Sequence, residues 1–283
     1  MSSQPPPPPS GPPVPQSPGP LPDAPDDGHV PDPAARRWGL GDAWIGILAS
    51  QLAAAFIGSI ILIVGGYDSI DEVPMTVFAM MNLPLHFTLA GVAIAVSRSK
   101  GEGAVRDFRI SSRWRDVPSG LFIGVAMQFL LVPAVTLPFI WLFGLDLDDV
   151  GESARELADR ADDTAGVIAL IFVVGVVAPL VEELFFRGLL FESYRKRRNM
   201  RWLELLLPEG RRPDTTSPRW NLWVGIIFSS AIFSVVHFQL ILIPALFAVG
   251  VVLAVMTHRT GRLGPAIWAH AAFNATTLVT LLA

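Results

Sequence analysis

The sequence predicts an all-α membrane protein: a polytopic bundle of about seven transmembrane helices with a disordered, proline-rich amino-terminal tail. Hydrophobic residues make up 51% of the 283 positions, charged residues make up 16%, and the mean hydropathy is +0.48. Soluble domains of this size seldom reach such values. The apolar residues also occur in runs of about 20 residues, which is the length that a helix needs to cross the hydrocarbon of a bilayer.

The amino-terminal tail is recognised by its proline content. Fourteen of the 25 prolines lie within the first 33 residues, where Ser, Gly, Gln and Asp fill most other positions. A segment with so little apolar surface cannot bury a core and is typical of disorder or polyproline II conformation. We expect residues 1–40 to form a disordered cytoplasmic tail, and we favour a solvated leader over a ligand for a proline-recognising domain. Residues 41–283 are then the transmembrane helical domain.

Seven apolar runs follow the tail and alternate with polar loops. They cover residues 44–64, 74–96, 117–143, 165–191, 222–237, 240–256 and 263–282. Each run is predicted to be a transmembrane helix, and no internal repeat is apparent.

The loop charges indicate how these helices are oriented. Lys and Arg are concentrated in the loops at 98–115 and 195–219, whereas Asp and Glu dominate those at 68–72 and 146–152. Short cytoplasmic loops are enriched in Lys and Arg. The alternation predicts a cytoplasmic amino terminus and a carboxy terminus on the opposite side of what we expect to be the plasma membrane.

Polar residues four positions apart interrupt three of the apolar runs. A charged residue at the centre of a bilayer costs roughly 2.5–3.5 kcal/mol, so the successive carboxylates Glu182 and Glu183 indicate a function. Residues four apart share one face of a helix, which predicts an ion pair between Glu183 and Arg187. Glu182 points about 100° away and is left free. By the same spacing, Phe233 shares a face with His237.

The last run carries His270 and Asn274 at the same spacing. A rise of about 1.5 Å per residue places this pair, Glu182 and His237 at similar depths, near or slightly to the cytoplasmic side of the midplane. A free carboxylate can act as a general base toward water, and a histidine can hold the same water or a metal. A histidine with an asparagine can donate hydrogen bonds to an oxyanion. These residues predict peptide or amide hydrolysis inside the membrane; the absence of cysteine excludes disulfides and a cysteine nucleophile.

The three motifs together resemble a known family. The pattern E-E-x-x-x-R starts at residue 182, F-x-x-x-H at 233 and H-x-x-x-N at 270, in an order and at intervals similar to those of the CAAX protease and bacteriocin-processing (CPBP/Abi) family. Its members are intramembrane proteases related to the type II CAAX prenyl endopeptidases. The resemblance covers residues 165–282 and implies a protease-like core at 165–283. It implies an endopeptidase that cleaves a membrane-associated or lipidated, CAAX-like protein.

The resemblance also implies roles for the motif residues. Glu182 would activate the attacking water, while Glu183 is held by Arg187. His237 would help to position that water.

The last motif would supply the oxyanion site, formed by His270 and Asn274. Whether the family uses a metal is open, although its members are often labelled metalloproteases. A divalent ion such as zinc could be held by Glu182, His237 and His270. The H-E-x-x-H pattern of zincins is absent from the sequence. The expected partners are membrane lipid and a membrane-anchored or prenylated protein or peptide, and no nucleic acid.

Two alternatives to a protease remain. The same fold could serve a non-enzymatic immunity or scaffold protein of the membrane, or the glutamate and histidines could form the proton relay of a transporter, which the lack of a visible inverted repeat disfavours. His86 stands alone in an apolar run and is predicted to be a hydrogen-bonded packing residue rather than a ligand.

Overall fold

The computed structural model describes residues 38–144, 152–196 and 218–282. These residues form helices joined by turns and loops, with no β-strand among them, as expected for an all-α protein. The predicted disordered tail falls almost entirely on residues 1–37, which lie outside the described residues. The described residues belong to one compact unit, Asp32–Ala283.

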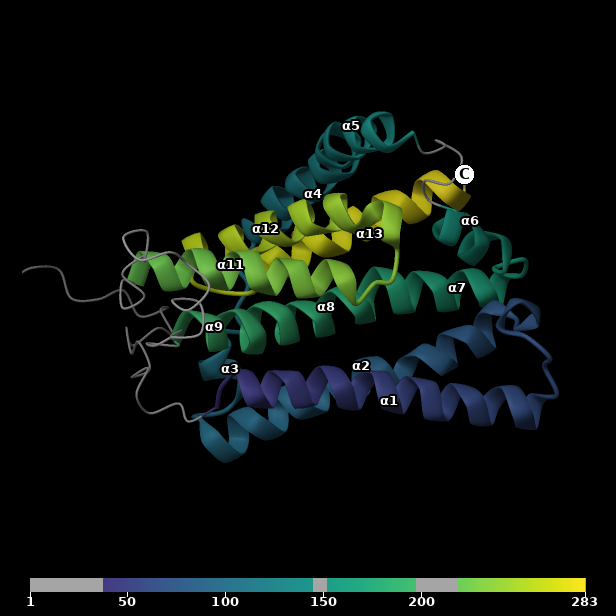
Figure 1. Ribbon diagram of the computed structural model, residues 1–283, viewed down its shortest axis with the longest axis horizontal. Helices are drawn as coiled ribbons and strands as arrows, with labels where there is room; N and C mark the ends of the chain where they lie inside the picture. Colours follow the sequence, from purple (N-terminus) through teal and green to yellow (C-terminus); the bar gives the residue numbers. More distant parts are fainter. Residues whose placement is uncertain (1–37, 145–151, 197–217, 283) are drawn as a thin grey trace, which may run out of the picture. The chain divides into compact units, whose positions relative to one another are not determined.

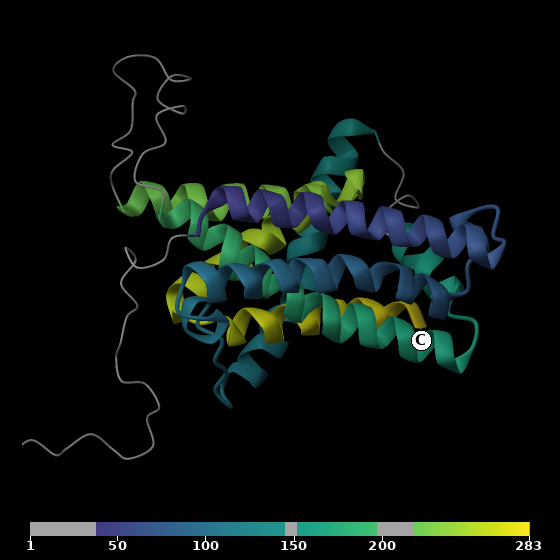
Figure 2. The ribbon, with the colours of Figure 1, turned by 90° about the horizontal axis from the view of Figure 1, so that it is seen from below.

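The first two helices form an antiparallel hairpin. Helix α1 (Leu40–Gly65) and helix α2 (Met75–Lys100) are joined by a turn that contains the 3-10 segment η1 (Ile70–Glu72), and they lie side by side in Figure 2. Gly66 ends α1 with φ 71°, the left-handed conformation in which glycine is favoured because it has no Cβ.

The outer surface of α1 is apolar. Ile45, Leu48, Leu52 and Phe56 follow one another at helical spacing and are 61–70% exposed. A helix in water would bury such a stripe against a core. Since nothing in the described chain covers it, this face is suited to contact with lipid.

The third span combines three consecutive helical segments. Helix α4 (Asp116–Ala126), the π-helical segment η2 (Met127–Leu131) and helix α5 (Val132–Phe143) follow the short helix α3 (Ala104–Asp107). Helix α4 packs closely against the last helix, α13 (Gly264–Leu282).

Two glycines permit this close packing. A Cβ on Gly120 would overlap the backbone and Cβ of Trp268, and one on Gly124 would overlap the carbonyl oxygen of Ala269 and the Cβ of Ala272. Small residues are common where membrane helices approach one another closely.

The fourth span alternates between α-helical and π-helical geometry. Its segments are α7 (Thr164–Phe172), η3 (Val173–Val177), α8 (Ala178–Glu182), η4 (Glu183–Phe191) and α9 (Glu192–Lys196), and the short helix α6 (Glu152–Asp159) precedes them. In the π-helical segments the backbone bonds join residues i and i+5, a rare geometry that is frequent at functional sites. In Figure 1 this span lies between the α1–α2 hairpin and the helices that follow it in the chain.

The carboxy-terminal part contains three further helices. They are α11 (Pro218–Val235), α12 (Ile243–Thr260), which follows the 3-10 segment η5 (Leu240–Leu242), and α13. Helix α11 packs against α12 and η4, and α13 packs against α8. The fourth span is therefore in contact with the helices that carry the second and third sequence motifs.

The predicted number of seven transmembrane helices is not confirmed. Within the described residues, five helices are long and apolar enough to cross a bilayer: Leu40–Gly65, Met75–Lys100, Asp116–Phe143, Thr164–Arg195 and Leu240–Thr260. The predicted fifth run forms the apolar helix Arg219–Val235, which is too short to be counted among these five. The predicted seventh run forms α13, whose histidine, asparagine and threonines lower its hydropathy. Five such helices still define an integral membrane protein.

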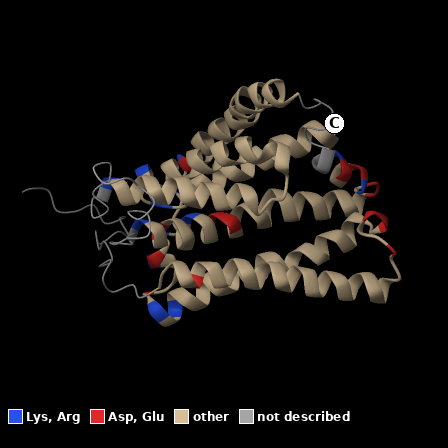
Figure 3. Cartoon of the chain, viewed as in Figure 1, with Lys and Arg blue, Asp and Glu red and all other residues tan. Residues whose placement is uncertain are grey.

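Charged residues gather at the two ends of the helices. Figure 3 shows most of the described Lys and Arg at one end and a group of Asp and Glu at the other. Figure 3 also shows red and blue segments between these two ends, and the segments α8 and η4 of the fourth span carry Glu182, Glu183 and Arg187.

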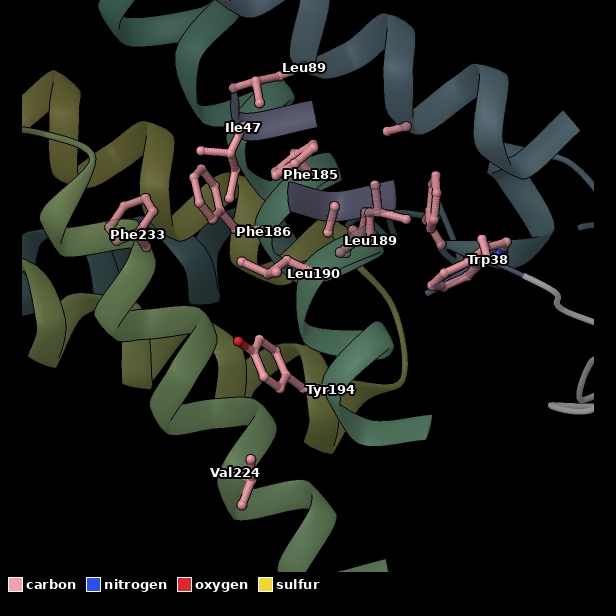
Figure 4. Close-up of a cluster of buried hydrophobic side chains, with 14 residues drawn as sticks. Trp38, Ile47, Leu89, Phe185, Phe186, Leu189, Leu190, Tyr194, Val224 and Phe233 are labelled. Carbon is pink, nitrogen blue, oxygen red and sulfur yellow. The ribbon is translucent and has the colours of Figure 1, made fainter. Parts of the chain in front are cut away.

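The largest group of buried side chains surrounds η4. Figure 4 shows the residues of this core: Phe185, Phe186, Leu189 and Leu190 of η4 with Ile47 of α1, Leu89 of α2 and Phe233 of α11. Both Phe185 and Leu189 are fully buried. The segment η4, which begins with Glu183, is thus packed against several other helices.

Candidate active site

Three helical segments bring their motif residues to one place. Glu182 is the last residue of α8, His237 follows the end of α11, and His270 lies in α13. The Nε2 atom of His237 is 3.7 Å from Oε2 of Glu182, and the Nε2 atom of His270 is 3.8 Å from the same oxygen. The depth predicted from the sequence agrees with this arrangement.

The carboxylate of Glu182 is buried but not satisfied. Its side chain is 12% exposed, and its Oε2 atom is buried without a hydrogen-bond partner in the described part of the chain. A buried acceptor without a donor is costly and usually has a functional explanation. Two imidazole nitrogens face this oxygen at distances too long for direct hydrogen bonds.

The other nitrogen of each imidazole determines which tautomer is present. Nδ1 of His237 lies 2.6 Å from the backbone oxygen of Phe233, and Nδ1 of His270 lies 2.9 Å from Oε1 of Glu183. Both of these oxygens only accept hydrogen bonds, so each Nδ1 carries a proton. In the neutral ring Nε2 then presents a lone pair, and both lone pairs face the carboxylate of Glu182.

The predicted ion pair is present beneath this centre. Nη1 of Arg187 is 2.9 Å from Oε1 of Glu183, and the two side chains are 1% and 0% exposed. Nη2 of Arg187 donates to the backbone oxygen of Gly250 at 3.3 Å. Glu183 therefore has a positive partner on one side and the ring of His270 on the other, whereas Glu182 forms no ion pair with an Arg or Lys among the described residues.

Phe233 connects the parts of the site. Its ring lies 4.6 Å from that of His237 and 5.7 Å from that of His270, in both cases edge to face. The guanidinium carbon of Arg187 lies 4.4 Å from its centroid, within the range of a cation–π contact. The phenylalanine of the second motif thus holds the two histidines and the arginine at fixed orientations, a role that its spacing from His237 did not predict.

Asn274 is oriented by the backbone of the fourth span. Its Nδ2 atom donates to the carbonyl oxygen of Val174 at 2.8 Å. Val174 belongs to the π-helical segment η3, in which its carbonyl would accept from residue 179. Residue 179 is proline and has no N–H, so the side chain of Asn274 takes the place of the missing donor. No hydrogen bond joins Asn274 to Glu182, His237 or the other motif side chains in the described part.

His86 is a member of the site that the sequence reasoning treated only as a packing residue. It lies on α2, and its Nε2 atom is 3.9 Å from Oε1 of Glu182. A single histidine in an apolar run is a weak signal. What places it here is the packing of α2 against α8 and η4, which the spacing of residues within one helix does not reveal.

A metal ion does not fit the described side chains as they stand. Zinc takes nitrogen and oxygen ligands at about 2.0–2.2 Å, usually three from the protein in a catalytic site. Among the described residues no group of three or more His, Asp or Glu side chains has an arrangement that would hold an ion. Glu182, His237 and His270, the candidate ligands, converge but do not form such a group.

The fold and this centre define an integral membrane protein with a buried glutamate and histidines at the meeting point of several helices. Residues 164–276 match a family described as "Rce1-like: Type II CAAX prenyl endopeptidase Rce1-like". The region contains all three motifs, so the resemblance to the CPBP family is confirmed for it. The match supports a membrane-embedded protease, and neither the substrate nor the mechanism follows from it.

A second comparison matches a stretch of similar length. A protein of Escherichia coli named "Uncharacterized 24.3 kDa protein" is 29% identical over 115 residues, which are 40% of this chain and 43% of that protein. The similarity thus spans less than half the length of either protein. No solved structure matches the chain significantly.

Proposed function

We propose that this protein is an intramembrane endopeptidase that hydrolyses a peptide bond of a membrane-associated or lipidated protein, using a water molecule activated by Glu182. The observation that carries the proposal is the unsatisfied Oε2 atom of Glu182, which faces the Nε2 lone pairs of His237 and His270 at 3.7 and 3.8 Å. Three acceptors that face one another require a donor between them.

A water molecule can donate hydrogen bonds to two of these three acceptors. An oxygen about 2.8 Å from each of two acceptors that lie 3.7 Å apart subtends an angle of roughly 80° between them. Each O–H bond then points within about 15° of its acceptor, which is good hydrogen-bond geometry. Such a water donates one hydrogen to Glu182 and the other to His237, and its own lone pairs remain available to attack a carbonyl carbon.

The reaction follows from this placement. The water oxygen bonds to the scissile carbonyl carbon while its proton passes to Oε2 of Glu182. When the C–N bond breaks, the same proton passes from Glu182 to the leaving amine, so that the carboxylate is regenerated. Burial of the site excludes bulk water and strengthens each of these interactions.

The oxyanion formed on the carbonyl requires donors. The amide of Asn274 has two N–H groups, and only one is used by Val174, so the second can donate to the oxyanion. Nε2 of His270 can donate only when the ring is doubly protonated, because its Nδ1 proton is already bound to Glu183. The proposed oxyanion role of His270 therefore requires the imidazolium form.

The substrate class rests on the family and on the position of the site. The side chain of His237 is 27% exposed, compared with 12% for Glu182 and 4% for His270, which favours approach of a substrate from the side of His237. The matching family is one of prenyl endopeptidases, and the five helices long and apolar enough to cross a bilayer support a site within the membrane. We propose a membrane-anchored or prenylated substrate and an approach from the cytoplasmic side.

The test is peptide cleavage by protein purified in detergent. The panel contains fluorogenic peptides that end in a prenylated CAAX sequence and the same peptides without the prenyl group. We expect Glu182→Gln to lower kcat by about 10²- to 10⁴-fold, the usual contribution of a general base. Glu192→Gln is the matched control, because Glu192 is a nearly buried glutamate of the same span that pairs with Arg195 outside the site.

Each result of this assay has a definite meaning. Cleavage by Glu182→Gln at the rate of the unmodified protein would refute the mechanism. The two halves of the panel decide whether the prenyl group is recognised, and repetition with a metal chelator decides whether an ion takes part. If no peptide is cleaved and the cellular function survives Glu182→Gln, the protein is a non-enzymatic immunity or scaffold protein and not a protease.

A further inference from the structure

We infer that His86 is a positioning residue of the site: it holds Oε1 of Glu182, so that Oε2 is aimed at the water between His237 and His270. This inference rests on the proposed function. It assigns a role to a helix outside residues 164–276, the region that matches the protease family.

The first observation is the burial and orientation of the ring. His86 is 6% exposed and lies in the middle of α2, a helix with lipid-facing apolar residues elsewhere on its surface. Its Nδ1 atom lies 3.0 Å from the backbone oxygen of Asn82, which only accepts, so Nδ1 carries a proton. This bond fixes the plane of the ring and turns Nε2 toward Glu182.

The second observation is the division of the two carboxylate oxygens of Glu182. Oε1 faces His86 at 3.9 Å, whereas Oε2 faces His237 at 3.7 Å and His270 at 3.8 Å. A carboxylate held at one oxygen alone can rotate about its terminal torsion, which has broad minima. Contacts on opposite sides restrict that rotation and keep one chosen oxygen directed at the reacting water.

The third observation is that two acceptor atoms, Nε2 of His86 and Oε1 of Glu182, face each other at 3.9 Å and therefore need a hydrogen between them. With a proton on Nδ1, the neutral ring presents a lone pair to a carboxylate oxygen, and two acceptors repel each other in a buried place. Either a bridging water or a proton on Nε2 turns the repulsion into an attraction. In both cases His86 binds Oε1 and does not touch the peptide bond that is cleaved.

The packing of α2 makes the position of His86 precise. Helix α2 contacts α7, α8 and η4, the segments that surround Glu182. Leu89, one turn along the same helix, is 4% exposed and belongs to the buried cluster around η4 in Figure 4. The helix that carries His86 is therefore anchored against the glutamate-bearing span by an apolar contact next to the polar one.

The inference is tested with two substitutions of His86 and one control. His86→Leu keeps an apolar side chain of moderate size but removes the nitrogen. His86→Gln places an amide nitrogen near the position of Nε2 and can still donate to Glu182. Leu89→Ala is the control for damage to packing, since it weakens the same helix contact without changing any polar group.

The readouts are kcat and KM for a cleaved peptide of the panel. We expect His86→Leu to lower kcat by about tenfold to a hundredfold with KM nearly unchanged, the loss caused by a misplaced catalytic group. His86→Gln should recover most of kcat. Leu89→Ala should lower the melting temperature without a comparable loss of kcat in the folded fraction.

A stability cycle provides a readout that does not depend on catalysis. The melting temperatures of His86→Leu, Glu182→Ala and the double variant are measured in one detergent, because alanine at position 182 leaves no polar group that could bind His86. If the two side chains bind each other, His86→Leu lowers the melting temperature less in the Glu182→Ala background than in the unmodified protein. Additive shifts would show that the contact does not exist.

The outcomes separate this inference from the proposed function. Full activity of Glu182→Gln overturns the proposed function, and the stability cycle still decides whether His86 holds Glu182. A kcat of His86→Leu equal to that of the unmodified protein, together with an inactive Glu182→Gln, overturns the role of His86 and leaves the proposed function standing. Equal losses for His86→Leu and His86→Gln would also contradict it.

Discussion

Replacing Arg187 with methionine removes the positive partner of a carboxylate that has no exposed surface. Glu183 is 0% exposed and pairs with Arg187 at 2.9 Å, and the guanidinium also contacts Phe233 and the backbone oxygen of Gly250. Breaking one side of a buried ion pair costs about 3–5 kcal/mol because the remaining charge is left without a partner. For a domain of about 200 residues, this predicts a fall in melting temperature of roughly 6–20 °C.

The prediction depends on the charge left behind and not on the loss of the arginine as such. The double variant Glu183→Gln/Arg187→Met removes both charges, and the glutamine oxygen can still accept from Nδ1 of His270. Replacing both members of a buried pair is often nearly neutral. We therefore expect the double variant to regain most of the lost melting temperature, although its activity stays low because His270 loses a charged neighbour.

The assay is thermal unfolding of the four proteins of this cycle in one detergent, followed by intrinsic tryptophan fluorescence. The reasoning is refuted if Arg187→Met melts within about 2 °C of the unmodified protein. It is also refuted if the effects of the two single substitutions simply add in the double variant, since additivity is the behaviour of side chains that do not interact.

Two further predictions concern the helices that support the site. Gly124→Ala should lower the melting temperature markedly, because the new Cβ would overlap the carbonyl oxygen of Ala269. The control is Gly91→Ala on α2, where a Cβ meets nothing within 4 Å, so this variant should be neutral or stabilised by up to about 1 kcal/mol. Equal effects of the two substitutions would contradict the close packing of α4 against α13. Asn274→Ala leaves the carbonyl of Val174 without a donor and should cost about 1–3 kcal/mol. The same substitution should cost less in the Pro179→Ala background, where the restored N–H can take that carbonyl; an unchanged cost would show that the proline is not the reason for the bond.

Local spacing was enough to predict several features of the site. The interval of four residues between Glu183 and Arg187 predicted their ion pair, and counting residues from the polar ends of the apolar runs predicted that Glu182, His237 and His270 lie at one depth. These predictions succeed because helix geometry and the thickness of the bilayer leave few choices for a residue in a transmembrane helix. The catalytic roles assigned to these residues remain predictions.

Other features depend on which helices meet. Asn274 was predicted to donate to an oxyanion, and the structure shows that one of its N–H groups is bound to Val174, a hundred residues away in the chain. That bond exists because a π-helical register directs the carbonyl of Val174 to the nitrogen of Pro179, and sequence periodicity does not reveal a π-helical register. The proline itself was visible in the sequence, but the residue that compensates for it was not.

The sequence by itself determined the class of this protein, because composition and the length of apolar runs decide whether a chain lies in lipid or in water. It also determined the pairs of polar residues within each helix. Only the tertiary structure decided that α2 packs against α8 and η4 and so brings His86 to Glu182, and that Phe233 holds two histidines and an arginine at once. The physical reason is that spacing along one helix fixes which side chains share a face, whereas contacts between helices depend on the packing of large and small residues over the whole bundle.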